Sequence, residues 1–436
     1  MNTIDSLAPA SANLPQSTGV VIIGGGVVGI GAAIYLAERG IPCLVCEKGR
    51  VAGEQSSRNW GWIRKQGRRP EEIALMLESD RLWRRFADEA GDFGFRTGGV
   101  SYFAQTDAEL QKHADWMTHA QHYQIETRLL TADEVAARTG RTDRRFVGGV
   151  TSPTDAYAEP ALAVPALARR AESLGAVIAP GTAVRTLLRE GGRVTGVVTE
   201  HGTVRADAVV LAGGAWTRTF LENMGQSFPQ LGVRSSAMRT TPVAQIDTST
   251  FGASGASIRP RVDGGYTIGR ATAARFDLIP AGFVHLRAFL PVLWRRRKMM
   301  KVRAGRAFFG PLGRHRWSGD DRSPFEMVRT VDPEPDASLL RDVFRSAREL
   351  YPHMAGARML QSWASLIDVM PDEMPVIDRI DRLPGLVVAS GMSGHGFGLG
   401  PAAGFLAAQL ATGREPIADP APYRFARFGP NHATQP

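Results

Sequence analysis

The sequence is poor in cysteine, and its two cysteines predict neither a disulfide framework nor a metal site. The 436 residues hold only Cys43 and Cys46, too few for the disulfide scaffold of a small secreted protein. Both lie in residues 41–47, an apolar stretch typical of a buried strand, where side chains three apart point to opposite faces. We therefore expect two buried thiols, and we expect no metal site in the protein.

The sequence also lacks a convincing membrane span and a signal peptide. Residues 20–37 carry no charge and just reach the length of a short span, but they hold five glycines and are followed at once by Glu38 and Arg39. The first 18 residues contain Asp5 and no Lys or Arg, so the positive start of a signal peptide is missing. We expect a cytoplasmic protein with flexible tails at 1–17 and 421–436.

Low-complexity composition is absent as well. With 48 glycines, 27 prolines, 43% hydrophobic and 22% charged residues, the chain has ordinary soluble usage and enough length for two or three domains with a large core. The formal net charge of +9 permits anionic partners but does not bear on the fold.

What is present begins with a strand, a glycine-rich turn and a helix. The apolar run 20–23 leads into Gly24-Gly25-Gly26-Val27-Val28-Gly29, which fits G-x-G-x-x-G, and 30–39 reads as a helix stopped by Gly40. A second strand ends at Glu47. In this context the motif predicts a dinucleotide-binding unit, with the phosphates at the helix N-terminus and the ribose hydroxyls at Glu47.

Further motifs are spread along the chain, and the set resembles one flavoprotein family. They are Ser56-Ser57-Arg58-Asn59, Asp155-Ala156-Tyr157-Ala158-Glu159-Pro160, residues 208–216, residues 370–378 with Met370-Pro371-Asp372, and the glycine run Gly394-His395-Gly396-Phe397-Gly398-Leu399-Gly400. Over about residues 18–415 the chain resembles the D-amino-acid oxidase family, which includes glycine and sarcosine oxidases. In that family the late glycine run approaches the flavin ring.

The resemblance implies an α/β protein with two domains. A Rossmann-like FAD-binding domain would be built from 18–95, 146–226 and 355–420, and an antiparallel-sheet substrate domain from 96–145 and 227–354. It also implies non-covalent FAD contacted by these residues: Gly24, Gly26, Val27, Val28, Gly29, Glu47, Lys48, Ser56, Ser57, Arg58, Asn59, Trp60, Val184, Ala212, Gly213, Trp216, Gly391, Ser393, Gly394, His395, Gly396, Phe397 and Gly398.

The reaction that the resemblance implies is oxidation of a carbon–nitrogen bond in an amino acid or N-alkyl amine. The flavin performs the hydride transfer, and oxygen or another electron carrier then takes the electrons. Asp368 would pair with the substrate ammonium, His395 would hold the substrate or the ring, and Arg64 would neutralise an anionic group. Trp60 and Trp62 would wall the site.

Two positions depart from the family. Ser365 stands where sarcosine oxidases carry the cysteine that attaches FAD, so we expect FAD to be held without a covalent bond. Ile367 stands where D-amino-acid oxidases place a carboxylate-binding Arg. A carboxylate would then be held by Arg64, Lys65 or Arg270, or the substrate would be a secondary amine.

Residues 283–309 mix apolar side chains with a basic block that contains Arg295, Arg296 and Arg297. Pro291 predicts a helix that begins near it rather than one that runs through it. One interpretation is an amphipathic helix on anionic lipid; the other is a surface helix whose apolar side packs on the substrate sheet. Nucleic acid is not expected, because no stacking platform accompanies the charges.

Two other functions remain open from the sequence. A flavin-dependent hydroxylase would share the dinucleotide unit, but the class normally has a Gly-Asp flavin motif, and 391–394 lacks the Asp. A non-catalytic flavin protein on a membrane surface would use the basic block. Anaerobic bleaching of the flavin separates the three functions. An amine alone should bleach the flavin of an amine oxidoreductase, a hydroxylase should require a nicotinamide, and a non-catalytic protein should show no specific reductant.

Overall fold

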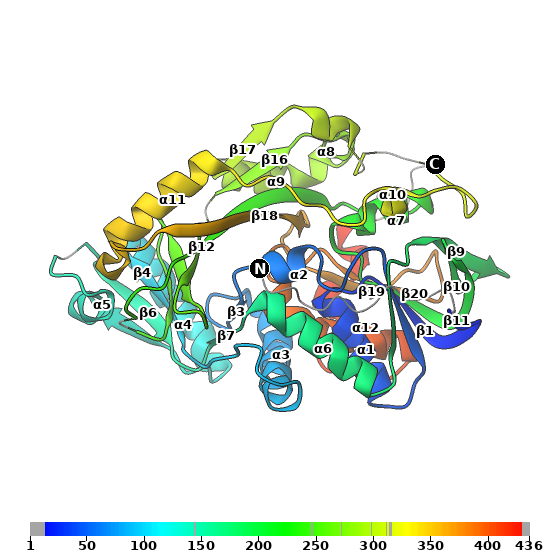
Figure 1. The fold of residues 1–436 in the computed structure, drawn as a ribbon, viewed down its shortest axis with the longest axis horizontal. Helices are drawn as coiled ribbons and strands as arrows, with labels where there is room; N and C mark the ends of the chain where they lie inside the picture. Colours follow the sequence, from blue (N-terminus) through cyan, green and yellow to red (C-terminus); the bar gives the residue numbers. More distant parts are fainter. Residues whose placement is uncertain are drawn as a thin grey trace.

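The computed structural model describes residues 14–143, 145–245, 247–271, 273–297, 299–310, 312–313 and 316–429. Within these residues the strands form an eight-stranded sheet, a ten-stranded sheet and a two-stranded pair, β3 (Trp62–Ile63) with β7 (Ala156–Tyr157). The eight-stranded sheet lies at the right of Figure 1. The ten-stranded sheet runs from the left over the top, where its long strands β12 (Leu231–Thr240) and β18 (Met359–Val369) lead toward β16 and β17. The predicted two-part α/β architecture is confirmed.

The eight-stranded sheet is the predicted dinucleotide-binding sheet. Its main path runs β19-β20-β11-β1-β2-β8, with β9 and β10 joined to the edge of β11. The four strands β11, β1, β2 and β8 are adjacent in this order and pair in parallel. Strand β20 also pairs in parallel with β11. The strands are β1 (Ser17–Ile23), β2 (Cys43–Glu47), β8 (Val177–Pro180), β9 (Val184–Glu190), β10 (Arg193–Thr199), β11 (Gly202–Leu211), β19 (Val376–Arg379) and β20 (Leu386–Ser390).

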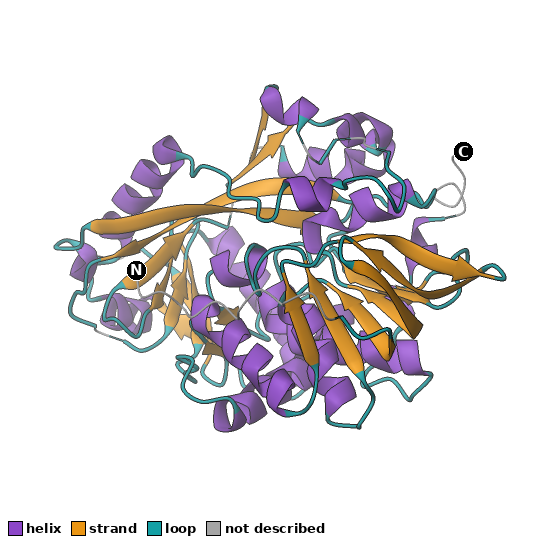
Figure 2. Cartoon of the chain, turned by 45° about the vertical axis from the view of Figure 1, so that its right-hand side comes forward, coloured by secondary structure: helices purple, strands orange, loops and turns teal. Residues whose placement is uncertain are grey.

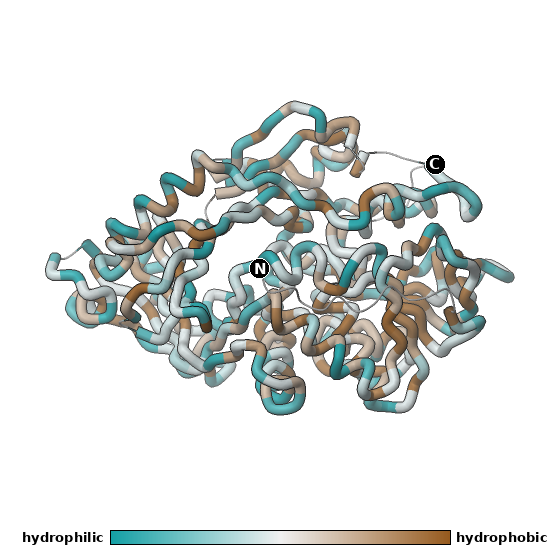
Figure 3. The backbone as a smooth tube through the Cα atoms, viewed as in Figure 1, coloured by the Kyte–Doolittle hydropathy of each residue, from teal (hydrophilic) through white to brown (hydrophobic). Residues whose placement is uncertain are grey.

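Both faces of this sheet are buried, which explains its continuous apolar strands. Successive residues of β1 enter different cores: Ile22 packs with the helices α1 and α12, and Val21 packs with strands β9 and β10 on the other face. Hydrophobic residues accordingly concentrate in these strands (Figure 3). Cys43 and Cys46 also enter opposite cores and are free, buried thiols, as predicted.

Helix α1 (Val27–Ala37) starts three residues earlier than its sequence pattern suggested, directly after the glycine turn. It packs against α12 (Gly396–Thr412) at a very close crossing. A Cβ at Gly31 would lie 3.0 Å from the carbonyl oxygen of Pro401, and one at Gly404 would collide with the backbone of α1. This crossing brings the two glycine-rich N-terminal segments to the same side of the sheet.

The remaining helices surround the two sheets (Figure 2). They are α2 (Gln55–Arg58), α3 (Pro70–Glu89), α4 (Asp107–His122), α5 (Ala132–Thr139), α6 (Pro160–Ser173), α7 (Thr217–Asn223), α8 (Pro280–Val284), α9 (Leu286–Arg296), α10 (Pro324–Met327) and α11 (Ala337–Leu350). A capping box between Thr131 and Glu134 opens α5. No helix among the described residues combines the length and the apolar character that crossing a membrane requires.

The ten-stranded sheet follows the path β17-β16-β12-β15-β14-β13-β4-β6-β5, and β18 pairs with the other edge of β12. It is mainly antiparallel, but β13 with β4 and β16 with β17 are parallel pairs. Its strands are β4 (Val100–Ala104), β5 (Arg128–Thr131), β6 (Gly148–Ser152), β12 (Leu231–Thr240), β13 (Thr250–Gly252), β14 (Ser257–Pro260), β15 (Tyr266–Gly269), β16 (Ala274–Asp277), β17 (Met300–Arg303) and β18 (Met359–Val369).

Two of these strands come from ranges that the sequence placed in the cofactor domain. β6 pairs with β4 and β5, and β18 pairs with β12 over almost its whole length. Periodicity marks a strand but does not show which sheet it joins. The division into domains stays a prediction. At β6 and at β18, the sheet to which the strand belongs differs from the domain predicted for it.

Helix α9 differs from expectation because it runs through Pro291. The helix buries Phe289 and Val292 against Leu231 and Phe276 of the ten-stranded sheet, and this packing outweighs the hydrogen bond that proline removes. One of the two sequence interpretations, a helix packed on the substrate sheet, therefore describes the buried side of α9.

The chain after residue 420 is ordered where the structure describes it. Tyr423 is buried, its hydroxyl donates to the Glu71 carbonyl at 2.8 Å, and Arg427 pairs with Asp372 at 2.6 Å. The expected flexible tail from 421 is therefore wrong for 421–429, because local composition does not reveal these distant partners. Residues 1–13 and 430–436 lie outside the described residues.

Candidate FAD and substrate site

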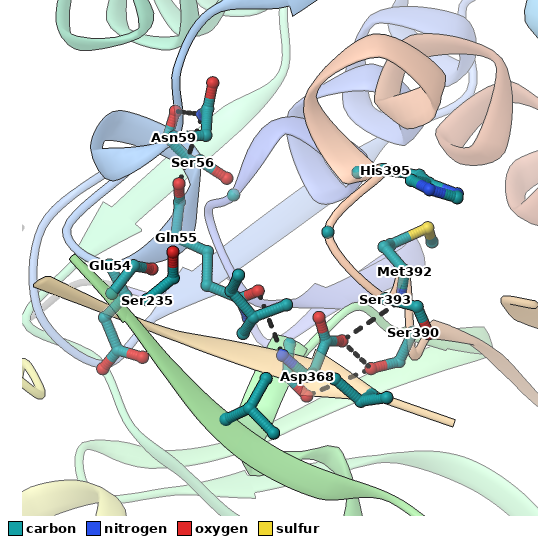
Figure 4. A pocket seen from close by; sticks show the side chains of 18 of the residues that line it. Glu54, Gln55, Ser56, Asn59, Ser235, Asp368, Ser390, Met392, Ser393 and His395 are labelled. Atoms are coloured by element: carbon teal, nitrogen blue, oxygen red, sulfur yellow. Dashed lines mark hydrogen bonds between the residues drawn. The ribbon is translucent and has the colours of Figure 1, made fainter. Parts of the chain in front are cut away.

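A cavity of about 720 Å³ lies between the two sheets. It is lined by the glycine turn before α1, by α2, by the loop after β11, by strands β12 and β18 and by the start of α12. Its size falls within the range of small-molecule and cofactor sites. Figure 4 shows Gln55 and Ser56 of α2 with the flanking Glu54 and Asn59 on one side, and Asp368, Ser390, Met392, Ser393 and His395 on the other.

The glycine turn is shaped by close backbone contacts. Gly24 has φ +111°, and a Cβ there would lie 2.5 Å from the carbonyl oxygen of Ala212. A Cβ at Gly29 would collide with the Gly24 carbonyl, so Gly29 sets the close packing of helix and turn. Gly26, by contrast, lines the cavity and has only the Ser56 hydroxyl near its Cβ position, at 3.0 Å. The turn thus leaves open backbone where a pyrophosphate would approach the α1 N-terminus.

Glu47 is held at the end of β2 in the predicted position. Its carboxylate accepts hydrogen bonds from the amides of Gly25 at 2.8 Å and Gly49 at 2.7 Å. Burial raises the pKa of Glu47, although both amides act in the opposite direction. Each carboxylate oxygen keeps a further lone pair, and Glu47 lines the cavity. The geometry is suited to accepting a ribose hydroxyl.

Glu54 joins several of the predicted cofactor residues to each other. It accepts from Lys48 Nζ at 2.8 Å and from Trp216 Nε1 at 3.1 Å. Lys48 also donates to two backbone carbonyls, at Val328 and Arg329. Lys48 and Trp216 line the cavity, but their polar atoms hold its wall together.

Arg58 and Asn59 are engaged in the same way. Arg58 pairs with Asp332 at 2.8 Å and donates to the Val331 carbonyl. The Asn59 side chain donates to the Ser56 carbonyl at 2.9 Å and accepts from the Gly61 amide at 2.8 Å. Ser56 is different, because its hydroxyl accepts the Val27 amide at the start of α1. It is therefore the side chain of this loop placed at the phosphate position.

Asp368 is buried at the end of β18, with its carboxylate turned toward the loop that leads to α12 (Figure 4). One oxygen, Oδ2, accepts from the Gly391 amide at 2.8 Å, the Ser390 hydroxyl at 3.3 Å and Gln230 Nε2 at 3.3 Å. Burial raises its pKa to about 6. Through Oδ2, Asp368 fixes this loop, and it also lines the cavity, so its pairing with a substrate ammonium stays a prediction.

His395 precedes the first residue of α12 and lines the cavity. Its Nδ1 lies 2.9 Å from Oε1 of Glu72, a fully buried residue of α3. Burial lowers the pKa of His395, with a further contribution from Arg68. Burial disfavours the charged form of Glu72, but the His395 hydrogen bond and the nearby arginines hold its pKa below the usual value. Glu72 therefore fixes the orientation of a neutral imidazole at the cavity.

The three cations named as carboxylate ligands have different surroundings. Arg270 lines the cavity and is held by the Gly255 carbonyl at 2.7 Å and the Ser346 hydroxyl at 3.1 Å. Arg64 also lines it. Lys65 does not: its ammonium is buried between Asp80 and Asp155, each at 3.2 Å, so its role is structural.

Most predicted cofactor residues do line the cavity. The exceptions are Gly29, which packs on Gly24, Ser57, whose hydroxyl donates to the Glu54 carbonyl, and Gly391, which donates to Asp368. Several further residues line the cavity that were not predicted from the sequence, among them Gln55, Arg68, Tyr102 and Ser390. Gln55 and Arg68 stand beside recognised motifs, but nothing local marks Tyr102 or Ser390 as part of a site.

Comparisons with known proteins agree with this geometry. A family model described as FAD dependent oxidoreductase (DAO) matches residues 19–410. Sarcosine oxidase subunit beta of an Arthrobacter species is 26% identical, over 96% of this chain and 92% of its own length. Glycine oxidase of Pseudomonas putida is 27% identical, over 94% of this chain and 98% of its own.

Among solved structures, L-amino acid deaminase from Proteus myxofaciens, in complex with anthranilate, superposes with a TM-score of 0.92 at 30% identity, covering 97% of this chain and 96% of its own. The open glycine turn, the Glu47 carboxylate and the α12 N-terminus on one cavity fit a flavin dinucleotide. The family match extends over nearly the whole chain, which places this protein in the DAO family of FAD-dependent oxidoreductases.

Proposed function

We propose that this FAD-dependent amine and amino-acid oxidoreductase acts on an amino acid whose α-carboxylate is bound by Arg270. The observation that carries the proposal is a single cavity lined by the dinucleotide turn, by the start of α12 and by Arg270. The names of the relatives, glycine oxidase and L-amino acid deaminase, support a substrate with amino and carboxylate groups. The guanidinium offers the bidentate geometry that a carboxylate prefers.

The glycine turn, Glu47 and the start of α12 would hold FAD, which would supply the hydride acceptor for the substrate carbon that carries the nitrogen. The residues of this chain provide binding and orientation. The amides at the start of α12 and the helix dipole favour negative charge at this end of the cavity. Because Nδ1 of His395 is engaged by Glu72, its Nε2 is the nitrogen left to hydrogen-bond the substrate or the flavin ring. Trp60 and Trp62 line the cavity and limit access of water.

An anaerobic substrate screen tests the function. Holoenzyme is mixed with single amino acids and N-alkyl amines of both configurations, and the absorbance of the oxidised flavin is followed. At least one compound is expected to bleach the flavin with no nicotinamide present. Bleaching that requires a nicotinamide would support the hydroxylase alternative and contradict the proposal. Adding oxygen or a soluble quinone to the bleached enzyme then identifies the electron acceptor.

Replacing Arg270 with methionine is expected to weaken substrate binding. The change keeps an unbranched side chain but removes a charged hydrogen-bond donor, which is worth roughly 1.5–3 kcal/mol and so about tenfold or more in the Kd from anaerobic titration. Arg341→Met, at an exposed position of α11 outside the cavity lining, is the matched control and should leave the Kd unchanged. An unaltered Kd in the Arg270 variant would remove this residue from the substrate site.

FAD is expected to be bound without a covalent link. Ser365 lines the cavity on β18 at the place of the family's attaching cysteine, and the two cysteines present are buried in β2. Acid precipitation of yellow holoenzyme should release all of the flavin into the supernatant. Colour that stays in the washed precipitate would contradict this expectation.

We further propose that residues 283–309 contact anionic membrane at its inner face. The buried side of α9 packs on the sheet, but its other side exposes Trp294 (72%), and the flanking α8 and the 3-10 helix Arg306–Phe309 expose Phe283 (58%) and Phe309 (87%). Helices α8 and α9 lie near the top of Figure 1, and the sequence from Arg295 to Arg297 adds a basic block. A helix that exposes aromatic and basic side chains together, as α9 does at Trp294 and Arg295, is typical of interfacial helices.

Pelleting with vesicles tests the membrane contact. The protein should pellet with anionic vesicles at low salt and less with neutral ones, and Trp294→Ser should reduce recovery. Leu129→Ser, at an exposed apolar position on β5, serves as the control. Equal recovery with and without vesicles would end this proposal.

A further inference from the structure

Arg68 is a buried cation of the cavity whose hydrogen bonding is incomplete. It is 3% exposed, lines the cavity and donates from Nε to the Arg64 carbonyl at 3.1 Å. In the part of the chain that the structure describes, its Nη1 has no hydrogen-bond partner. A buried guanidinium group without a full set of partners is costly, so this donor points to a ligand.

A second guanidinium stands beside it. Arg64 lines the same cavity, with Cζ 5.7 Å from the centre of the Tyr102 ring. Burial and the charge of Arg64 lower the pKa of Arg68 to about 10. The charges that face the pair are the ionised Glu72, bonded to His395, and Asp155, paired with Lys65. Glu72 therefore balances only one of the two positive charges of Arg64 and Arg68, and the other is left without a compensating carboxylate.

The turn that carries both arginines is held rigidly. The Asp155 carboxylate accepts the amides of Lys65 at 2.9 Å and Gln66 at 3.2 Å. The Arg68 carbonyl accepts from Trp116 Nε1 at 2.8 Å. A rigid pair of forked donors loses little conformational entropy when an anion binds, which favours recognition of a carboxylate.

An aromatic row connects this pair to Arg270. Trp60 contacts Trp62 with ring centres 6.0 Å apart, and Trp62 contacts Tyr102 at 5.6 Å. At one end Trp60 packs on Gly269, the residue before Arg270. At the other end the Arg64 guanidinium lies near Tyr102. The cavity wall therefore has a cationic group at each end and an apolar stretch between them.

We propose that Arg64 and Arg68 form a second carboxylate subsite, so that the substrate is an amino acid with a second carboxylate. The α-carboxylate lies at Arg270, the carbon chain lies along Trp60, Trp62 and Tyr102, and the distal carboxylate lies between the two guanidinium groups. This inference rests on the proposed function, and it narrows the substrate class to dicarboxylic amino acids, including amines that carry two carboxyalkyl groups.

The test measures binding without turnover. Holoenzyme is titrated with α,ω-dicarboxylates from succinate to pimelate and with monocarboxylates of the same length, and perturbation of the flavin spectrum gives each Kd. One chain length is expected to bind at least about tenfold more tightly as the dicarboxylate than as the monocarboxylate. Arg68→Met should abolish this advantage and leave the monocarboxylate Kd unchanged, Arg68→Lys should restore part of it, and Arg341→Met should have no effect.

Three results would overturn the subsite. The first is equal affinity of the wild type for dicarboxylates and monocarboxylates. The second is an equal loss of affinity for both series in Arg68→Met. The third is an Arg68→Met variant that keeps the dicarboxylate advantage but has a changed affinity of the flavin for sulfite. The last would assign Arg68 to the flavin. If the dicarboxylate advantage holds but no amino acid or amine bleaches the flavin anaerobically, the subsite stands and the proposed function fails.

Discussion

Replacing Gly26 with alanine is expected to remove most of the bound FAD while leaving the fold intact. Gly26 has φ −81°, which any residue adopts, and only the Ser56 hydroxyl lies near its Cβ position. The new methyl group would occupy the space where a pyrophosphate meets the first amides of α1. It would also disturb the Ser56 bond to the Val27 amide. We expect the Kd for FAD to rise by about tenfold to a hundredfold, or about 1.4–2.8 kcal/mol.

Fluorescence titration of the apoprotein with FAD measures this effect, and circular dichroism checks the fold. Gly356→Ala is the matched control, because a Cβ at Gly356 has no neighbour within 4 Å. An unchanged Kd in Gly26→Ala, with native circular dichroism, would mean that the phosphates do not lie at this turn.

Replacing Asp368 with alanine is expected to release the loop before α12 and to lower stability. The Gly391 amide and the Gln230 amide group would lose their acceptor in a buried site, at a cost on the order of 3 kcal/mol together. Asparagine keeps one acceptor oxygen and should retain the loop. We therefore expect Asp368→Ala, but not Asp368→Asn, to bind FAD poorly and to unfold at lower urea concentration.

The asparagine variant also separates this role from that of a charged group. Burial raises the folded pKa of Asp368 from 3.8 to about 6, so the folded state binds this proton more tightly than the unfolded state. Its contribution to stability is complete below the unfolded pKa and disappears as the pH rises through about 6. Relative to Asp368→Asn, the wild type should lose about 3 kcal/mol between about pH 4 and pH 8. A difference in unfolding free energy between the two proteins that stays constant across this range would contradict a raised pKa of the buried Asp368 carboxyl.

The dinucleotide unit could be predicted from sequence because its signals are local. A buried strand, the turn from Gly24 to Gly29 and Glu47 all fall within about 30 residues, a span in which spacing fixes geometry. The capping box at Thr131 and the apolar spacing of α3 are local signals of the same kind. Resemblance to the family added the late glycine run, which no short-range pattern connects to Gly24.

The parts that could not be predicted depend on contacts between distant residues. The hydrogen bond of His395 with Glu72 joins positions 323 apart in sequence, and the cluster that receives Asp368 includes Gln230 from 138 residues away. Composition gives no sign of such partners, so the anchoring of the loop by Asp368 was not predicted. The helix start predicted near Pro291 is wrong, because the burial of Phe289 and Val292 stabilises a helix that runs through the proline.

The most direct test of the whole account is single-turnover bleaching of the bound flavin under anaerobic conditions, with an amino acid and with its α-deuterated form. The account predicts bleaching by the amino acid alone and a clearly slower rate with deuterium, because the bond between the α-carbon and its hydrogen breaks as the flavin is reduced. Flavin that stays oxidised with every amine and amino acid, yet is bleached by a reduced nicotinamide, would contradict it.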